Sequence, residues 1–229
     1  MKGLLITLVV LVGLAVVADR VGVGIAEKKV AEQIQQQGKL AGTPDVSITG
    51  FPFLTQAIAG RYTDVRISLT AADLDQPPGT SARVSLHGVR VPLSDVVSGN
   101  VRHIPVDRID GTATLSYALL AAQLGGDTTL RREGDGLRIT KTVHVAGFTL
   151  PLTAAGTVRL EGNVLAIDVE NASGVGVTVP SYLVREVSRL LDLSYKIPPL
   201  PFGLTLTSVS PGDAGVVVQV AASNTVLSG

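Results

Sequence analysis

The chain has 229 residues, and its 19 Lys and Arg balance 19 Asp and Glu, so the formal net charge is zero. The absence of Cys excludes disulfides, cysteine-ligated metal centres and thiol nucleophiles. The charge balance argues against a nucleic-acid partner, because such binding needs a surplus of Lys and Arg to displace counterions.

The N-terminal segment has the pattern of an export signal. Lys2 is followed by sixteen uncharged and mostly aliphatic residues, Gly3–Ala18, before Asp19 and Arg20 end the run. As a helix this run spans about 24 Å, slightly less than the ~30 Å of a bilayer's hydrocarbon core. Residues 1–18 are therefore either a signal peptide cleaved after Ala18 or a retained N-terminal membrane anchor. Both alternatives place residues 19–229 outside the cytoplasmic membrane, in the cell envelope or secreted.

The next segment, Asp19–Gln37, predicts an amphipathic helix of about five turns that Gly38 ends. Its apolar residues recur at spacings of three and four and comprise Val21, Val23, Ile25, Ala26, Val30 and Ile34. The expected polar side comprises Glu27, Lys28, Lys29, Glu32, Gln33 and Gln35 to Gln37. We expect this helix to pack on a sheet, because a membrane-surface helix would be more basic.

After Pro44 the apolar pattern changes to a period of two, which predicts strands. The runs fall at 64–69, 106–116, 139–145, 157–169, 204–209 and 215–222. Two further helices are expected, a short one at Ser116–Leu124 and a longer one at Pro180–Leu193. Because helices do not alternate regularly with the strands, we predict antiparallel pairing, an α+β fold and a single domain over 19–229.

Three segments share a glycine-centred pattern: Val46–Leu54, Val84–Leu93 and Val143–Leu152. In each, apolar residues step by two, then by three across Gly50, Gly88 or Gly147, and then by two again. A step of three moves side chains to the wrong face unless one residue bulges out, and glycine tolerates a bulge. The pattern predicts kinked strands in a strongly curved sheet, which encloses either its own packed core or an elongated apolar cavity.

The polar residues do not form a recognisable catalytic or metal-binding motif. His87, His103 and His144 lack a metal-ligand spacing, and His87 and His144 fall on the polar side of strands, where we expect solvent exposure. Asp107 and Asp110 have the spacing of an acid–base pair, although a turn near Gly111 explains them more simply. We predict no enzyme activity, no metal and no cofactor, and keep a lipid hydrolase using Asp107 or Asp110 as the least favoured alternative.

Residues Val46–Gln56, followed by Gly60-Arg61-Tyr62 and Val65, resemble the hallmark stretch of the LmeA family of actinobacterial phospholipid-binding envelope proteins. The apolar N-terminus, the following helix and the chain length also resemble that family. The resemblance implies a tubular lipid-binding-like fold, with a long helix held in a highly curved antiparallel sheet and an apolar groove for acyl chains. It further implies binding of phosphatidylinositol-type lipids and a role in assembling envelope mannolipids.

The expected function is thus a non-enzymatic phospholipid carrier or presenter at the outer face of the cytoplasmic membrane, supporting lipomannan-type glycolipid metabolism, with envelope glycolipid enzymes as partners. The alternative is a ligandless β-rich cell-surface scaffold or partner-binding module. The expected apolar lining comprises Ile34, Phe51, Phe53, Leu54, Val65, Ile67, Leu69, Val89, Val91, Phe148, Leu150, Leu183, Val187, Leu190 and Leu191. Arginines suit a lipid phosphate, and the head-group candidates are Arg131, Arg132, Arg185 and Arg189.

Overall fold

The computed structural model describes residues 2–98, 101–125, 127–145, 148–162, 164–174, 193–196, 200 and 203–228. The chain divides into two compact units. The first unit comprises Met1–Leu69, Arg83–Asp110 and Ala222–Gly229, and the second comprises Thr70–Ala82 and Gly111–Ala221. Each unit is described by itself below, and the single-domain assignment stays a prediction.

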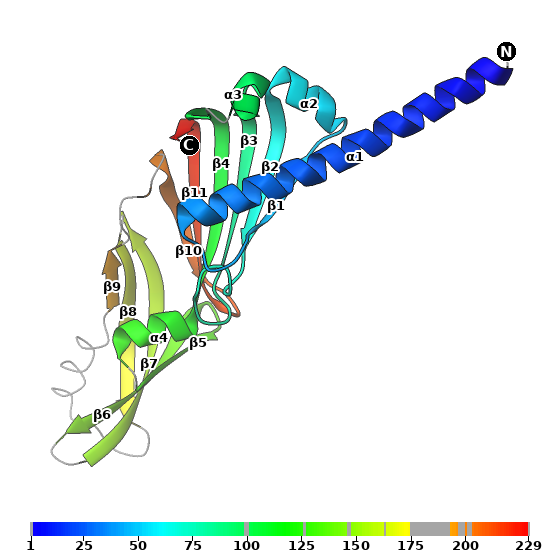
Figure 1. Cartoon of the computed structure of the whole chain (residues 1–229). Coiled ribbons are helices and arrows are strands. Elements are labelled where there is room, and N and C mark those ends of the chain that lie inside the picture. Colours follow the sequence, from blue (N-terminus) through cyan, green and yellow to red (C-terminus); the bar gives the residue numbers. More distant parts are fainter. Residues whose placement is uncertain are drawn as a thin grey trace. The chain divides into compact units, whose positions relative to one another are not determined.

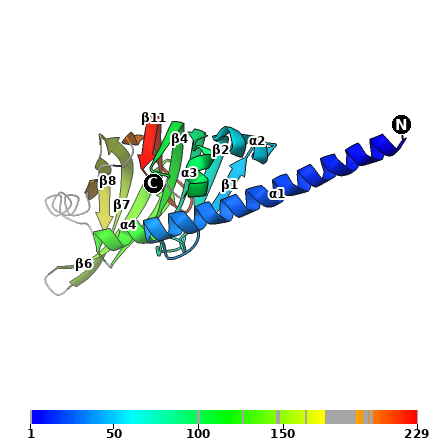
Figure 2. The same cartoon turned by 45° about the horizontal axis from the view of Figure 1, so that its top comes forward.

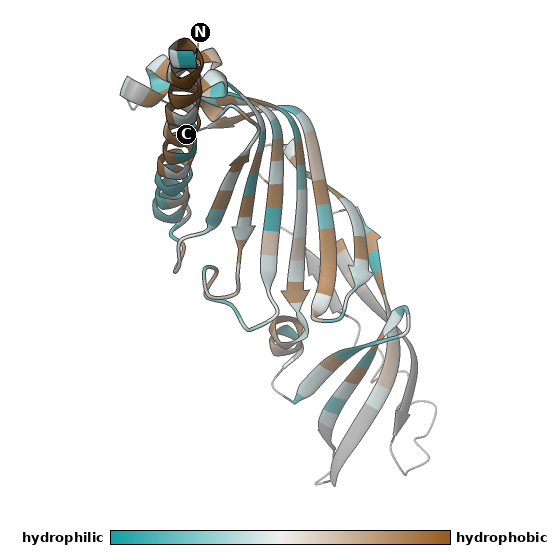
Figure 3. Ribbon diagram, turned by 90° about the vertical axis from the view of Figure 1, so that its right-hand side faces the viewer, coloured by the Kyte–Doolittle hydropathy of each residue, from teal (hydrophilic) through white to brown (hydrophobic). Residues whose placement is uncertain are grey.

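The N-terminal helix of the first unit, α1 (Lys2–Gly38), confirms the predicted helix and continues it without a break through the apolar run. α1 is long and apolar enough to cross a membrane, which agrees with both a signal peptide and an anchor. Figure 3 shows its hydrophobic residues towards the N-terminus and its hydrophilic residues towards Gly38.

The buried side of α1 differs from the predicted stripe. Asp19, Val23 and Ala31 are buried, whereas Val30 is exposed and Glu27 is half-buried. Val21 and Ile25, also expected in the stripe, are exposed. The reason is that α1 packs against β1 (Asp45–Thr49) and α2 (Phe53–Ala59), and a narrow contact needs only one row of residues at four-residue spacing.

The first sheet has the order β1-β2-β3-β4-β11-β10, where β2 is Arg61–Leu69, β3 Ser81–Arg90, β4 His103–Ser116, β11 Gly215–Ser228 and β10 Thr205–Pro211 (Figure 1). β1 pairs antiparallel with β2, so that Val46 faces Ile67 and Ile48 faces Val65. The short helix α2 lies between β1 and β2, and α3 (Leu93–Ser98) follows β3. These strands confirm four of the predicted runs, at 64–69, 106–116, 204–209 and 215–222.

The second unit contains a sheet of strands in chain order, β5 (Thr128–Glu133), β6 (Gly136–Val145), β7 (Phe148–Glu161), β8 (Val164–Gly174) and β9 (Leu193–Lys196). The run expected at 157–169 is wrong as one strand, because β7 ends at Glu161 and pairs antiparallel with β8 from Val164. The run at 139–145 is confirmed within β6. The predicted helix at Ser116–Leu124 is confirmed as α4 (Tyr117–Leu124), which packs beside β5 (Figure 1). Figure 2 shows α4 together with β6, β7 and β8 of the same unit.

The core of the second unit joins α4 to strands of both sheets. Its buried members are Leu120, Leu130, Leu137, Ile139, Ala154, Val216 and Val218. With the long helix α1 and antiparallel pairing in both sheets, this confirms the α+β class. The helix expected at 180–193 falls outside the described residues, except that Leu193 begins β9.

The glycine-centred pattern has a different outcome in each copy. At Gly88, β3 continues with φ +66°, and Leu86 and Val89 are both buried on either side of it, as the bulge prediction requires. A Cβ at Gly88 would overlap the Asp107 carboxylate of β4, so this position needs glycine for space as well as for its dihedral angle.

The other two copies correct the prediction of kinked strands. β1 ends at Thr49, and Gly50 with φ +108° leads out of it towards α2. β6 ends at Val145 and β7 begins at Phe148, with Val143 facing Leu150, so the third copy is a hairpin whose Gly147 lies outside the described residues. A glycine permits a strand to end as readily as to bulge, and the spacing alone does not distinguish these outcomes.

Candidate functional site

Two cavities in the second unit lie around α4 and β5, and Tyr117 lines both. The first, which we call the basic cavity, has a volume of about 500 Å³ and is lined by Tyr117, Arg131, Arg132, Gly134 and Asp213. The second, the apolar cavity, has a volume of about 470 Å³ and is lined by Tyr117, Ala118, Ala121, Ala122, Thr128, Thr129 and Leu130. We refer to the two together as the α4–β5 cleft.

The start of α4 is fixed by a buried cap. The Ser116 hydroxyl accepts a hydrogen bond from the backbone N–H of Leu119 at 3.2 Å, the usual arrangement at an N-cap. The Thr80 hydroxyl donates to the same oxygen at 3.0 Å, and both side chains are buried. Tyr117, the first residue of the helix, is thereby held at the junction of the two cavities.

The Tyr117 ring is held at its other end as well. Its hydroxyl donates a hydrogen bond to the Gly212 carbonyl at 2.6 Å. Burial raises the pKa of the Tyr117 phenol, with Arg132 opposing and Asp213 reinforcing that rise. Tyr117 therefore stays protonated at neutral pH, as a fixed and uncharged wall between the basic and the apolar cavity.

The basic cavity contains two arginines in different states. Arg132 lies 2.8 Å from Asp213 and donates a hydrogen bond to the Gly134 carbonyl at 2.9 Å. The Asp213 side chain is 96% exposed, so this ion pair contributes little stability. Within the described part of the chain the Arg131 guanidinium has no ion-pair partner, and the cross-strand neighbour of Arg131, Arg138, is paired with Glu133.

The apolar cavity is walled by small side chains of α4. Ala118, Ala121 and Ala122 recur at spacings of three and four, which places them on one side of the helix. Across from them, β5 contributes Leu130 and Thr128, both buried. The Thr128 hydroxyl has no hydrogen-bond partner among the described residues, an uncommon state for a buried polar group.

The structure brings two of the four head-group candidates together. Arg131 and Arg132 both line the basic cavity, whereas Arg185 and Arg189 fall outside the described residues. The sequence-based reasoning did not find Tyr117, Asp213 or the alanines of α4. The alanine spacing in the helix at 117–124 was a usable signal, but Asp213 reaches the cavity only through tertiary structure.

None of the expected apolar lining residues whose side chains the structure describes lines either cavity. In the first unit Phe53, Val65 and Val89 are buried, Ile34, Ile67, Leu69 and Val91 are half-buried, and Phe51 and Leu54 are exposed. Phe148 and Leu150 belong to β7, but their side chains are not described. Leu183, Val187, Leu190 and Leu191 fall outside the described residues. Their assignment to a lipid groove stays a prediction.

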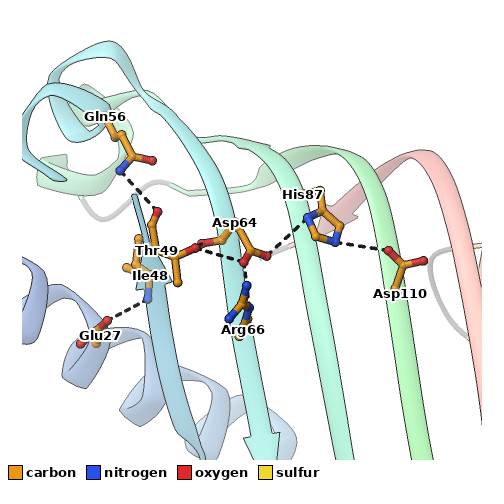
Figure 4. A network of polar contacts seen from close by, with 8 residues as sticks. All are labelled: Glu27, Ile48, Thr49, Gln56, Asp64, Arg66, His87 and Asp110. Atoms are coloured by element: carbon orange, nitrogen blue, oxygen red, sulfur yellow. Dashed lines mark hydrogen bonds and ion pairs between the residues drawn. The ribbon is translucent and has the colours of Figure 1, made fainter. Parts of the chain in front are cut away.

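The first unit contains a polar network centred on Asp64 of β2, shown in Figure 4. The Asp64 carboxylate accepts a hydrogen bond from the Thr49 hydroxyl at 3.0 Å and lies 2.8 Å from Arg66. His87 lies 3.4 Å from Asp64 and 3.2 Å from Asp110, which joins β2, β3 and β4. The His87 side chain is 36% exposed, so it is partly open to solvent, as expected, and also takes part in this network.

Two further contacts connect this part of the sheet to its neighbours. The Glu27 carboxylate of α1 accepts a hydrogen bond from the backbone N–H of Ile48 at 2.8 Å, which explains why Glu27 is half-buried (Figure 4). Asp110 also pairs with Arg108 at 2.8 Å, and Asp107 pairs with Arg90. Both aspartates of the hydrolase alternative thus have a structural role as partners of arginines.

A family model described as LmeA-like phospholipid-binding matches residues 17–221. No curated protein and no solved structure matches the chain.

Proposed function

The chain belongs to the LmeA-like phospholipid-binding family, and on that premise we propose that it is a non-enzymatic carrier or presenter of phospholipid that holds its ligand in the α4–β5 cleft. The observation that carries the proposal is the junction at Tyr117, where a basic cavity meets an apolar one. A phospholipid has the same division between an anionic head group and apolar chains.

The head group is assigned to the basic cavity. Arg131, which has no ion-pair partner among the described residues, offers a guanidinium to a phosphate, and guanidinium–phosphate contacts are strong because they are charge-assisted. Arg132 can exchange its exposed partner Asp213 for the same phosphate at little energetic cost. The volume of about 500 Å³ lies within the range of about 300–1,000 Å³ that small-molecule sites occupy.

The start of the acyl chains is assigned to the apolar cavity. Ala118, Ala121 and Ala122 leave room beside α4 that a larger side chain would fill. The Thr128 hydroxyl, which lacks a hydrogen-bond partner in the described part of the chain, is a donor beside this space, and a lipid ester carbonyl is an acceptor that would satisfy it. Such a bond would remove the cost of leaving a buried hydroxyl unpaired, about 1–3 kcal/mol.

The energetics favour a carrier over a tight store of lipid. Moving an acyl methylene from water to an apolar site gains about 0.8 kcal/mol, but a lipid that leaves a bilayer has its chains in hydrocarbon already. The net free energy of moving a lipid from membrane to protein is then close to zero, and the head-group contacts decide its sign. Uptake and release near a membrane follow from that balance.

We place the protein outside the cytoplasmic membrane, with residues 1–18 as its export or anchoring segment. A role in envelope glycolipid metabolism of the lipomannan type, with phosphatidylinositol-type lipid as ligand and glycolipid enzymes as partners, completes the proposal. That part rests on the family resemblance of Val46–Gln56.

The test is phospholipid binding by the full chain with both arginines of the basic cavity neutralised. We expect R131Q/R132Q to bind phosphatidylinositol vesicle lipid at least about tenfold more weakly, because a hydrogen bond to a charged group contributes about 1.5–3 kcal/mol. The measurement is the amount of labelled phosphatidylinositol extracted from vesicles, with bound lipid identified by native mass spectrometry.

R108Q is the matched control, because Arg108 is also a partly exposed arginine lying 2.8 Å from an aspartate, but in the first unit. It should extract lipid like the unaltered chain. Equal extraction by R131Q/R132Q and R108Q would refute the cleft assignment. Failure of the unaltered chain to extract any lipid would favour the ligandless cell-surface scaffold instead.

A further inference from the structure

One end of the first unit exposes a cluster of large apolar side chains on and beside its two short helices. Phe51, just before α2, is 64% exposed, and Ile58 within α2 is 75% exposed. Leu54 of α2 and Leu93 and Val96 of α3 are exposed as well, and α2 packs against α3 (Figure 1). We call these five residues the apolar tip.

The apolar tip is attached to α1 at the residue that follows the apolar run. The Asp19 carboxylate accepts a hydrogen bond from the backbone N–H of Leu54 at 2.8 Å, and Asp19 is only 2% exposed. The Arg20 guanidinium lies 5.1 Å from the centre of the Phe51 ring, a cation–π contact. Two residues of the apolar tip, Leu54 and Phe51, therefore contact the first turn of α1 after Ala18.

The same turn is packed closely against α2. The position that a Cβ on Gly22 would take lies 3.5 Å from Leu54 and 3.6 Å from the Phe53 ring, so α1 and α2 touch where α1 has no side chain. Residues 3–18 then continue from this contact as the same helix, with their large side chains exposed. The tip and the end of the apolar run thus lie at one place in the first unit.

We propose that the apolar tip inserts into the surface of the bilayer that residues 3–18 cross. With residues 3–18 in the hydrocarbon core, the membrane surface lies near Ala18, and Asp19 is one helical rise, about 1.5 Å, further along the helix. The tip then lies at the depth where interfacial apolar side chains are buried, about 5–10 Å into the head-group and acyl boundary. α2 carries no charged residue that would oppose this.

The inference goes beyond lipid binding in the cleft, because it concerns a second contact with lipid that holds the first unit against the membrane. A single transmembrane helix would leave the first unit free to rotate relative to the membrane surface. The apolar tip adds a second attachment point that restricts this rotation. The tip is attached to α1 directly after the apolar run, so a bilayer crossed by that run lies beside the tip. This favours the bilayer over a soluble protein as the partner of this surface.

The absence of Trp from the chain permits a direct test with single-tryptophan variants of the full chain. We would reconstitute I58W, Q37W and V10W in vesicles of phosphatidylcholine and phosphatidylglycerol with brominated acyl chains, and measure quenching of tryptophan fluorescence. Val10 lies in the apolar run, and Gln37 is an exposed residue of α1 eighteen residues beyond Asp19, about 27 Å along the helix.

We expect strong quenching of V10W, clear quenching of I58W and none of Q37W. L93W, on α3, gives a second reporter of the tip should I58W fold poorly, and we expect it to be quenched as well. Quenching of I58W and L93W no greater than that of Q37W would overturn the proposal. An unquenched V10W would overturn it too, because the helix would then not cross the bilayer.

Discussion

The two units of the chain use their charged side chains in different ways. In the first unit, Asp64 pairs with Arg66 of its own strand, accepts a hydrogen bond from Thr49 of β1 and lies beside His87 of β3. In the second unit, Arg131 and Arg132 line an open cavity, one without a partner among the described residues and one with an exposed partner. The contacts of the first network connect neighbouring strands of a sheet, whereas two guanidinium groups of the second unit face a cavity, which is why we propose the second unit as the ligand site.

The largest expected effect is a loss of stability in the core of the second unit, which tests whether the two units unfold separately. Ile139 is fully buried there, and I139A should cost about 2–5 kcal/mol because it removes buried methyl groups and leaves a cavity. Native-state hydrogen exchange of the full chain should show that amides of β5, β6 and β7 open more easily, with β1 and β2 unchanged.

I139V is the graded control, with an expected cost of about 0.5–1.5 kcal/mol in the same strands. If I139A accelerated exchange in β1 and β2 as much as in β6, the two units would not be separate cooperative structures, and the comparison between them would lose its physical basis.

A smaller effect is expected in the first unit from D64A. The substitution removes the carboxylate that pairs with Arg66 and accepts from the Thr49 hydroxyl, which keeps the Asp64 backbone carbonyl as an acceptor at 3.2 Å. Arg66 is exposed to water, so we expect the net loss of about one hydrogen bond, about 0.5–1.5 kcal/mol. Amide exchange in β1 and β2 should rise, because Thr49 pairs with Asp64 in their register.

D64N keeps an acceptor oxygen at the same place and should therefore lose less stability than D64A. The decisive readout is lipid extraction, which we expect both variants to retain. A loss of extraction in D64N with unchanged exchange would mean that the first network takes part in ligand binding and is not only structural.

The decrease of folding stability at alkaline pH should depend on the phenol of Tyr117. Burial raises the pKa of this phenol above its ordinary value of about 10, so its stabilising contribution is complete below that pH and is lost as pH rises through the folded-state pKa. Y117F should lose about 0.5–1.5 kcal/mol at pH 7, because the hydrogen bond to the Gly212 carbonyl is gone.

Thermal unfolding followed by circular dichroism between pH 7 and pH 11 measures both effects. The gap in Tm between the unaltered chain and Y117F should narrow at the alkaline end. A gap that stays constant or widens with pH would contradict the assigned hydrogen bond.

The sequence predicted local structure best where side-chain periodicity is the direct consequence of packing. The helix over Asp19–Gln37, the helix at Ser116–Leu124 and most strands have the predicted type, because each buries one face. The LmeA resemblance, carried by Val46–Gln56, is likewise confirmed. Arg131 and Arg132 were found as head-group candidates because an adjacent pair of arginines beside a turn is visible in the sequence.

The remaining features depend on partners distant in sequence. The glycine pattern coincides with a positive φ inside a continuous strand at Gly88, where Asp107 of the next strand occupies the space, but with a strand end at Gly50 and with a hairpin between β6 and β7. Asp213 is 81 residues from Arg132, and no spacing rule connects them. Glu27 looked like part of a solvated face, yet it accepts the Ile48 N–H at the edge of the sheet.

The most direct measurement is covalent mapping of bound lipid. A phosphatidylinositol analogue with a photoactivatable group near the start of one acyl chain would be loaded on the full chain, irradiated, and its attachment sites read by peptide mass spectrometry. Attachment to α4 and β5, around Ala118, Ala121 and Leu130, is the predicted result. Attachment confined to β1–β4 of the first unit would contradict the account.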